Sequence, residues 1–373
     1  MQHDEIKTFR DLIQEVQARG LCGRCGGCVS FCSAGEFNAL RFGKDGAPEF
    51  ADEQKCLKCG ICYLVCPQIK ALDNDLKKKF YWREPVGPYR SLRSAKTTHP
   101  KVASVATDGG VVTSLLMYAL DRGLIDGAVV SRRTGLFMRE PAVVTTDEDL
   151  IEAAGSHFDN ISPPLGEIGT SYTSFVPTIR EVRKLWQRGL TRVAFVGTPC
   201  QVYSLRKMQM LHVVPSDVVV LAIGLFCMEN FSLTPETFRQ LEEKLSVPME
   251  KVVKLNIKDD VIVTLDDGGA LHVGFEILDE FARPACFACM DFANEFADIS
   301  CGGLGSPDGY TTVMVRTRAG ERVYNGAKQK GFVQEMKFHD EEESLLHRTT
   351  QMAKITAFAE RKRKRAAEVL ESR

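Results

Sequence analysis

Hydrophobic and polar positions along the chain follow the two periods of regular secondary structure. Apolar residues at helical spacing over 3–19 predict a helix close to the N-terminus. From about residue 99 the pattern alternates between helices, such as 110–122, and buried strands, such as 192–197 and 217–226. This alternation is typical of α/β folds, in which helices cover the faces of a largely parallel sheet.

Three further segments do not fit that alternation. Strand-like runs crowd residues 252–275 and predict an antiparallel addition, so we assign a mixed α/β or α+β fold. Residues 71–97 are polar and basic and contain two prolines, which predicts a linker over the surface. The segment 337–373 is helical in pattern and highly charged. We interpret its basic run, 361–365, as a solvated helix end, with contact to an acidic partner as the alternative.

Composition and charge exclude two classes of partner. The 373 residues contain 48 Lys plus Arg and 49 Asp plus Glu, so the formal net charge is −1. A charge this small gives no overall field for nucleic acid or an anionic membrane. No apolar stretch is long enough to predict a membrane-spanning helix, and the charged N-terminus lacks the apolar region of a signal peptide. We therefore expect a cytoplasmic protein, with attachment to a membrane complex as an option.

The 13 cysteines contain most of the chemical information. Without an export signal, metal or redox chemistry is a better interpretation than disulfides. Eight of them repeat one spacing twice: Cys22, Cys25, Cys28 and Cys32, then Cys56, Cys59, Cys62 and Cys66. This spacing is typical of two [4Fe–4S] clusters, in which the fourth cysteine of each run binds the other cluster. The crossed assignment therefore puts Cys66 with the first three cysteines and Cys32 with the second three.

Other interpretations of these eight cysteines are weaker. Zinc sites usually take two cysteine pairs set well apart, and not three ligands in seven residues. A disulfide knot is disfavoured by the expected compartment. The segment 33–55 between the motifs is long for a minimal ferredoxin, which predicts a lengthened hairpin.

The remaining five cysteines are dispersed and less informative. Cys200 and Cys227 each follow a predicted buried strand, and Cys286 and Cys289 form a closely spaced pair. Residues just past the carboxyl ends of adjacent strands can meet at one site, so these four could hold a third [4Fe–4S] cluster. Spacing alone supports that cluster and its absence equally. We interpret Cys301 as a small buried residue.

Glycine-rich turns supply possible binding loops. Asp108-Gly109-Gly110 opens a helix that includes Thr113, where free amides and the helix dipole favour the phosphates of a dinucleotide such as FAD or NAD. Plain turn chemistry explains the same glycines, because the Rossmann spacing is absent. The loop 302–312 is either a close approach to a flat ligand or a mobile loop. The other candidate cofactor-binding residues in such turns are Gly155, Ser156, His157, Thr198, Gly305 and Tyr310.

The combination of clusters and glycine turns favours a flavin. Iron–sulfur clusters pass single electrons, whereas most soluble reductants deliver hydride. A protein that joins the two needs a flavin, because flavins perform both kinds of transfer. We therefore expect hydride exchange at one end of the protein and single-electron transfer at the other.

The core from about 99 to 325 resembles the beta subunits of coenzyme F420-reducing hydrogenase and related F420 dehydrogenases. The matching strings, in family order, are TDGGVVTSLLMYAL, GLIDGAVV, AAGSHF, VGTPCQV, IGLFCMENF, VVKLNI, CFACMDFANEFADIS and GSPDGYTTVMVRT. The resemblance implies a core that binds FAD, a [4Fe–4S] cluster and the deazaflavin F420. It implies that the cluster ligands are Cys200, Cys227, Cys286 and Cys289. It also implies FAD contacts from the Gly-Gly-Val-Val-Thr and GSHF turns, and a place near the flavin or the F420 tail for Lys254.

The N-terminal double motif on this core looks like the electron-input component of membrane F420H2 dehydrogenases and the front half of F420-dependent sulfite reductase. We divide the chain into four parts. They are a two-cluster ferredoxin domain at 1–75, a linker at 76–98, a core that binds FAD, F420 and a cluster at 99–325, and a helical tail at 326–373.

The resemblance implies an F420-linked oxidoreductase component of a larger redox system. Hydride would pass between F420 and FAD, and single electrons would pass through three clusters to or from a partner redox protein. That partner would be a heterodisulfide reductase, a dehydrogenase or a membrane complex, and no catalytic acid or base is assigned. Three alternatives stay open: a reductase of a tetrapyrrole-type substrate on the same core, a relay protein without flavin, and a metal-storing or structural cysteine protein.

Overall fold

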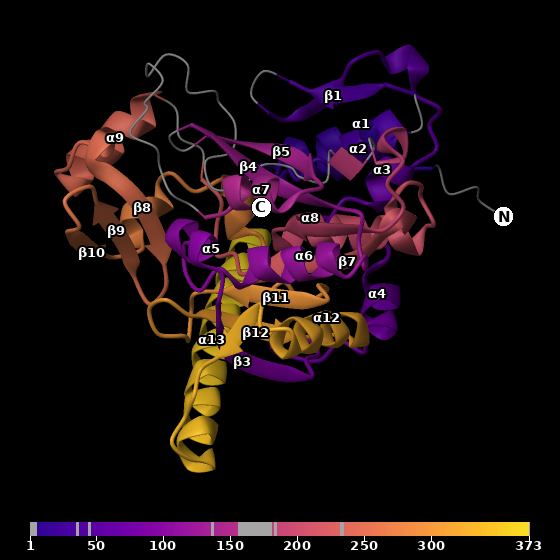
Figure 1. The fold of residues 1–373 in the computed structure, drawn as a ribbon. Helices are drawn as coiled ribbons and strands as arrows, with labels where there is room; N and C mark the ends of the chain where they lie inside the picture. Colours follow the sequence, from indigo (N-terminus) through magenta and orange to yellow (C-terminus); the bar gives the residue numbers. More distant parts are fainter. Residues whose placement is uncertain are drawn as a thin grey trace.

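The computed structural model describes residues 6–34, 37–43, 46–135, 138–155, 181–182, 185–231 and 235–372. Within these residues the centre is an eight-stranded sheet in the order β13-β3-β12-β11-β7-β6-β4-β5 (Figure 1). In chain order its strands are β3 (Ser91–Thr97), β4 (Gly127–Gly135), β5 (Met138–Val144), β6 (Val193–Gly197), β7 (Val219–Leu225), β11 (Ile299–Gly302), β12 (Thr311–Val315) and β13 (Val333–Glu335). The predicted mixed α/β class is confirmed.

The middle of the sheet is parallel and its borders are antiparallel. β4 pairs with β6, β6 with β7, and β7 with β11, all in parallel, with Phe195 opposite Ala222 in the register. β5, β12, β3 and β13 join the sheet through antiparallel pairs. Because parallel strands point their carboxyl ends to one edge, the loops after β6, β7 and β11 meet there.

Helices cover both faces of the sheet. They are α5 (Pro100–Val105), α6 (Val111–Asp121), α7 (Asp147–Ala153) and α12 (Arg318–Gln329) on one face and α8 (Pro199–Met210) on the other. Successive strand residues point to opposite faces, so Ala194 packs towards α6 while Phe195 packs towards α8. Strands buried on both sides explain the continuous apolar runs in the sequence. The predicted helix over 110–122 is α6 and is confirmed.

A smaller antiparallel sheet stands beside the main one. Its order is β10-β9-β8, formed by β8 (Val252–Ile257), β9 (Val261–Leu265) and β10 (Ala270–Val273), with α9 (Pro235–Leu245) and α10 (Glu276–Asp279) against it (Figure 1). This addition has an apolar core of its own around Met249. The antiparallel addition predicted at 252–275 is confirmed. The amide of Asn256 donates to the carbonyl of Thr107 at 2.9 Å and fixes β8 to the edge of the main sheet.

The N-terminal unit, residues 6–79, is built from short elements. They are α1 (Phe9–Leu12) with a π-helical turn (Ile13–Gln17), α2 (Gly27–Ala34), β1 (Leu40–Phe42), β2 (Pro48–Phe50), α3 (Ile61–Leu64) and α4 (Asp73–Lys79). Thr8 caps α1 reciprocally, since its amide donates to the Asp11 carboxylate at 2.6 Å and its side chain accepts from Arg10. The antiparallel β1–β2 pair confirms the hairpin predicted between the cysteine motifs.

Polar contacts join the N-terminal unit to α8. The hydroxyl of Ser204 donates to the carbonyl of Val65 at 2.9 Å. The buried ammonium of Lys207 donates to the carbonyl of Cys66 at 3.0 Å and pairs with Asp73 at 3.2 Å. Burial lowers the pKa of Lys207, while Asp73 acts in the opposite direction. α8 therefore packs against the sheet and also binds the N-terminal unit.

Two strands lie where the sequence predicted a linker and a tail. β3 pairs along its length with β12, so the linker prediction is wrong for residues 91–97. The sequence pattern did not reveal β3 as a strand, because some of its buried positions are polar. The hydroxyl of Ser94 bonds Ser306 at 2.6 Å, and that of Thr97 bonds Ser114 at 2.6 Å. β13, within the predicted helical tail, completes the sheet beside β3.

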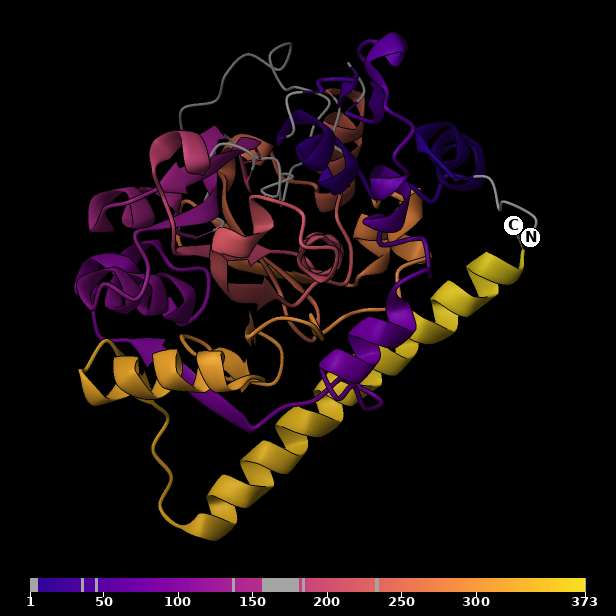
Figure 2. The same ribbon diagram turned by 90° about the vertical axis from the view of Figure 1, so that its right-hand side faces the viewer.

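The helix α13 (Glu341–Glu371) runs as one long rod along one side of the molecule, with its first turns projecting from it (Figure 2). Gln351 bonds the buried hydroxyls of Ser94 and Ser306, and Ile355 is fully buried. Further along, Arg363 and Arg365 pair with buried carboxylates, and Lys362 is 1% exposed. The prediction of a solvated basic helix end is therefore wrong for Lys362, Arg363 and Arg365, while Arg361 and Lys364 are exposed. None of the helices in the described residues is long and apolar enough to span a membrane.

Candidate functional site

A cavity of about 340 Å³ opens at the carboxyl edge of the main sheet. Val196 at the end of β6, Leu225 at the end of β7 and Gly302 at the end of β11 form its floor. The start of α6 forms one wall, and Leu255 and Ile257 of β8 form another. Open α/β sheets bind ligands at this edge, because the loops after adjacent parallel strands converge there. The predicted binding residues should therefore line this cavity.

The turn before α6 brings several predicted residues to the cavity. Asp108, Gly110, Thr113 and Gly155 line it. Gly110 has a φ of 68°, which favours glycine, and it is the N-cap of α6, whose first amides have no partner within the helix and no side-chain cap. Gly109 stands behind the turn, where its amide donates to the Thr311 hydroxyl at 2.9 Å. A helix start with these residues suits the phosphates of a dinucleotide.

Other predicted residues lie elsewhere. Ser156 and His157 are outside the described residues. Thr198 caps α8, with its amide donating to Gln201 at 2.9 Å, and does not line the cavity. Gly305 packs against Gln351 of α13, and Tyr310 lies under the ammonium of Lys96, 5.0 Å from the ring centre. None of the last three positions lines the cavity, although the hydroxyl of Thr198 lies 3.4 Å from the sulfur of Cys200.

Charged residues gather around Asp108 at the cavity, and among them Lys258 was not predicted from the sequence. Lys258 lines the cavity, and its ammonium lies 2.7 Å from Asp308 and 3.7 Å from Asp108. Asn256 donates to Asp108 at 3.1 Å. Burial raises the pKa of Asp108, against the lysines; burial also lowers the pKa of the half-buried Lys254. Part of the signal was present, because residues 254 and 256 alternate along β8 and residue 258 follows the end of that strand directly.

Four cysteines of the core converge next to this cavity, and we call them the core cysteine set: Cys200, Cys227, Cys286 and Cys289. Cys200 lies in the first turn of α8, directly after β6, and Cys227 follows β7 and lines the cavity. Cys286 and Cys289 flank the end of the short helix α11 (Pro284–Phe287). Burial raises the pKa of each of Cys200, Cys227 and Cys286, and the neighbouring thiols of the set raise it further.

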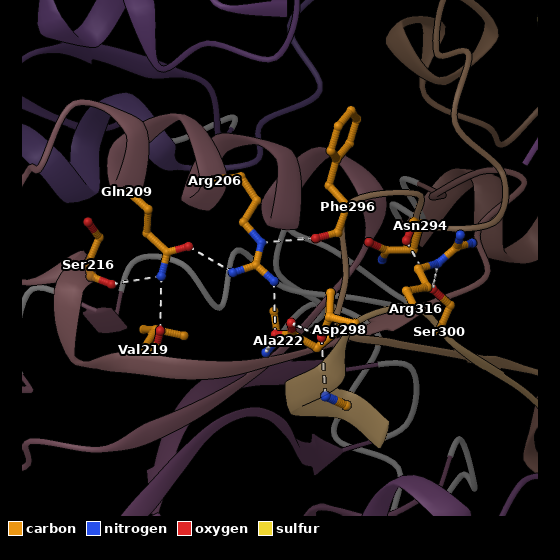
Figure 3. A network of polar contacts seen from close by, with 12 residues as sticks. Arg206, Gln209, Ser216, Val219, Ala222, Asn294, Phe296, Asp298, Ser300 and Arg316 are labelled. Carbon is orange, nitrogen blue, oxygen red and sulfur yellow. Dashed lines mark hydrogen bonds and ion pairs between the residues drawn. The ribbon is translucent and has the colours of Figure 1, made fainter. Parts of the chain in front are cut away.

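A buried polar network holds the segment after Cys289 against the sheet (Figure 3). Arg206 of α8 donates to the carbonyl of Phe296 and to Asp298, both at 2.9 Å. Asp298 in turn accepts the amide of Ala222 in β7 at 2.7 Å. Arg316 donates to the carbonyl of Ala293 at 2.9 Å. The network fixes Cys286 and Cys289 relative to the two strand ends that position Cys200 and Cys227.

The N-terminal cysteines fall into two sets. We call Cys22, Cys25, Cys28 and Cys66 the first set, and Cys32, Cys56, Cys59 and Cys62 the second set. Burial and the thiols of Cys66 and Cys22 raise the pKa of Cys25 to about 12. The four residues of the second set line one cavity of about 30 Å³, and Cys62 has Cys59 and Cys56 as its neighbours. This grouping agrees with the crossed assignment, while ligation itself stays a prediction.

The three sets form a row from the cavity to the surface. Cys227 touches the cavity, and Cys200 interacts with Cys25 of the first set. Cys28 of the first set interacts with Cys62 of the second, and Cys59 of the second set is exposed. Cys301 is buried in β11, where burial raises its pKa to about 12, and it lines the cavity together with Cys227. Its placement fits the predicted packing role.

The donor chemistry of the three sets fits clusters. Among the described residues, no three His, Cys, Asp or Glu side chains lie close enough together to hold a single metal ion. A [4Fe–4S] cluster attaches each thiolate to a different iron, so its four ligands stand around a cluster and not around one ion. Four grouped thiols, half-buried or buried apart from Cys59, meet that requirement.

Two family models match the chain, and both describe the coenzyme F420 hydrogenase/dehydrogenase beta subunit. The model of its N-terminal part matches residues 92–167, and the model of its C-terminal part matches residues 190–341. The matched residues include the cavity turn, the strands β6 and β7 and the core cysteine set. The N-terminal unit and α13 lie outside both models.

Curated relatives cover different parts of the chain. The coenzyme F420-dependent sulfite reductase of Methanocaldococcus jannaschii is 32% identical over 85% of this chain, which spans 48% of that protein. The coenzyme F420 hydrogenase subunit beta of Methanothermobacter thermautotrophicus is 34% identical over 66% of this chain and 84% of its own length. A component of the F(420)H(2) dehydrogenase of Methanosarcina mazei is 28% identical over 84% of each chain.

A solved structure agrees with these matches. It is a chain of the F420-reducing [NiFe] hydrogenase complex from Methanosarcina barkeri, 28% identical, with a TM-score of 0.63. The similarity covers 78% of this chain and 94% of that chain. The resemblance stated from the sequence is thus confirmed at the level of family and fold, and the chain belongs to the family of coenzyme F420 hydrogenase/dehydrogenase beta subunits.

Proposed function

We propose that this protein is an F420-linked oxidoreductase subunit that exchanges hydride with coenzyme F420 at a bound FAD and single electrons with a partner through three [4Fe–4S] clusters. One observation carries the proposal. The cavity of about 340 Å³ has Cys227 in its wall, and the thiols continue from there to the exposed Cys59. A site for a two-electron cofactor therefore adjoins a row of sites for one-electron centres.

The cavity residues suit FAD. The amides at the start of α6 and the hydroxyl of Thr113 would hold its phosphates, with Gly155 on the facing loop. Apolar side chains of the cavity, such as Leu116, Val130 and Val196, would keep water from the ring. When bound, FAD supplies the conversion between hydride and single-electron transfer. Ser156 and His157 remain predicted contacts of the same loop.

The positive side of the cavity suits F420. Lys258 lines the cavity and Lys254 is half-buried close to Asp108, so both ammonium groups can face an anionic tail. Lys254 is the predicted contact but is not among the residues that line the cavity, whereas Lys258 lines it and extends that prediction. Gly305 and Tyr310 stand outside the cavity wall, which favours roles in holding the loop that follows β11.

The cysteine sets would hold the clusters as grouped above. The core cysteine set would bind the cluster next to FAD, the first set the next one, and the second set the cluster nearest the surface. The exposed Cys59 lies where a partner redox protein could approach. That partner would be a heterodisulfide reductase, a dehydrogenase or a membrane complex, and the chain would work in the cytoplasm or at the edge of such a complex.

The test is anoxic purification followed by cofactor and activity measurements. We expect about 12 iron atoms and one FAD per chain, and oxidation of F420H2 with a viologen dye as the electron acceptor. Bound FAD without F420H2 oxidation would favour the tetrapyrrole-type reductase, which ferredoxin-driven assays would then identify. Bound clusters without FAD would favour the relay protein without flavin. A chain that binds no clusters would contradict the proposed function and the relay protein alike.

A further inference from the structure

A buried lysine of α13 lies against the core cysteine set. Lys362 is 1% exposed, and its ammonium donates to the carbonyl of Cys227 at 2.5 Å and to that of Asp291 at 3.0 Å. One acceptor follows β7, and the other follows the pair formed by Cys286 and Cys289. A single side chain therefore ties together the two segments that position three of the four thiols.

The charge of Lys362 needs a counter-charge. Both of these acceptors are backbone carbonyls, which have no formal charge, and an ammonium is costly to bury without an anionic partner. The carboxylate of Asp291 accepts the amides of Asn294 at 2.7 Å and Glu295 at 3.0 Å. Asp291 acts on Lys362 electrostatically, and the other groups that do so are the thiols of Cys289, Cys227 and Cys286. A [4Fe–4S] cluster with four thiolates is anionic and would supply the counter-charge on the side of the thiols.

The rest of α13 fixes Lys362 in this position. On the N-terminal side, Ile355 and Ala359 are fully buried. On the C-terminal side, Arg363 pairs with Glu295 at 2.5 Å and Arg365 pairs with Glu229, and both carboxylates are buried. Buried contacts of α13 before and after residue 362 therefore fix the position of the ammonium. The match to the C-terminal family model ends at residue 341, where α13 begins, so this lysine is an addition to the matched core.

We propose that Lys362 sets the reduction potential of the cluster bound by the core cysteine set, as a fixed positive charge that α13 delivers. The inference depends on the proposed function, because it requires that cluster. Reduction adds one electron to an already anionic centre, and a buried cation beside it stabilises the reduced form more than the oxidised form. Lys362 neither gains nor loses an electron or a proton in this role.

The test compares Lys362→Met with Lys364→Met in the full chain, purified anoxically. Lys364 is exposed on the same helix, so its variant removes the same charge from a position away from the thiols. EPR-monitored redox titration follows each cluster separately. We expect at least a tenfold fall in the equilibrium constant for reduction of the core cluster in Lys362→Met, about 59 mV for one electron. The N-terminal clusters of both variants, and the core cluster of Lys364→Met, should keep their potentials.

The outcomes separate this inference from the proposed function. A wild-type chain with about eight iron atoms would refute the third cluster itself, before any variant is made. A core cluster present in Lys362→Met with unchanged potential would overturn the role of Lys362 alone. If Lys362→Met loses the core cluster, Lys362→Arg decides: retention by the arginine variant supports the charge, and equal loss from both overturns it.

Discussion

The N-terminal unit and the core group their cysteines by different routes. In the N-terminal unit, six of the eight cysteines stand in two local runs of three. The fourth cysteine that follows each run, Cys32 or Cys66, belongs to the set of the other run. In the core, the four thiols come from segments after β6, after β7 and around α11. The first arrangement depends on local chain geometry, and the second exists only when the sheet is complete.

This difference implies different sensitivities. The core cysteine set depends on buried polar contacts far away in sequence, such as Arg206 with Asp298, which are 92 positions apart. The N-terminal unit depends more on short-range caps and a small apolar cluster around Phe9, although α8 and the end of α13 also contact it. A change that loosens the sheet should therefore remove the core cluster and spare the other two.

The largest effect is expected from Cys286→Ser combined with Cys289→Ser. Serine is a poor cluster ligand, so the double variant should lose about four iron atoms and all electron transfer from F420H2 to an external acceptor, while FAD stays bound. Iron analysis, FAD release and dye reduction measure the three quantities. Cys301→Ser is the matched control and should keep all of its iron; loss of iron from the control would contradict the assignment of Cys301.

Asp298→Asn should come next. The substitution leaves the guanidinium of Arg206 buried without its anion, which costs about 3–5 kcal/mol of the free energy of unfolding. In guanidinium titrations we expect the core cluster to be lost first, with the N-terminal clusters retained. Glu321→Gln, at an exposed pair with Arg90, should cost under about 1 kcal/mol. Simultaneous loss of all clusters in Asp298→Asn would show that the two regions unfold together.

The pH dependence of stability should be concentrated in the core. Burial, with the charge of Asp291, raises the pKa of Glu295 to about 8. Because the folded state keeps this proton above the pH at which the unfolded chain releases it, stability should fall as pH rises from about 4.5 to 8. The total is at most about 5 kcal/mol. Glu295→Gln should flatten the slope in thermal unfolding at several pH values, and an unchanged slope would exclude this carboxyl as the cause.

Thr8→Ala should have the smallest effect. It removes the reciprocal cap of α1 and should cost about 1 kcal/mol, confined to the N-terminal unit. Hydrogen exchange should increase over 9–17 and stay unchanged in β6 and β7. Faster exchange in those strands would mean that the N-terminal unit stabilises the sheet, and the contrast between the regions would then be weaker than we infer.

Sequence patterns predicted the elements whose signal is local. The double cysteine motif, the hairpin between its halves, α6 and the β8–β10 addition were all readable, because each is specified by residues close in the chain. β3 was missed because its buried positions include Ser94 and Thr97, whose hydroxyls find partners only in the folded protein. Polar residues satisfied by distant partners are invisible to periodicity.

The basic run shows a signal that was present and misread. Ile355, Ala359, Lys362 and Ala366 recur at helical spacing and are all buried. One lysine of five basic residues therefore stood on the inner stripe of the helix. The prediction relied on the charge of the basic run and not on the helical spacing of its residues, because a lysine is rarely buried unless it is paired with an anion. Similarly, Asn256 shares a face of β8 with Lys254, and Lys258 follows that strand directly, but neither residue was predicted.

The place of Lys362 in the chain also sets an order of assembly. It follows Cys227 by 135 positions, so a chain made from its N-terminus presents all the core cysteines long before the lysine emerges. The tie that Lys362 makes between the segments of Cys227 and Asp291 is therefore among the last long-range contacts that a growing chain can form. We expect chains interrupted before residue 362 to hold the core cysteine set less firmly than the full chain does.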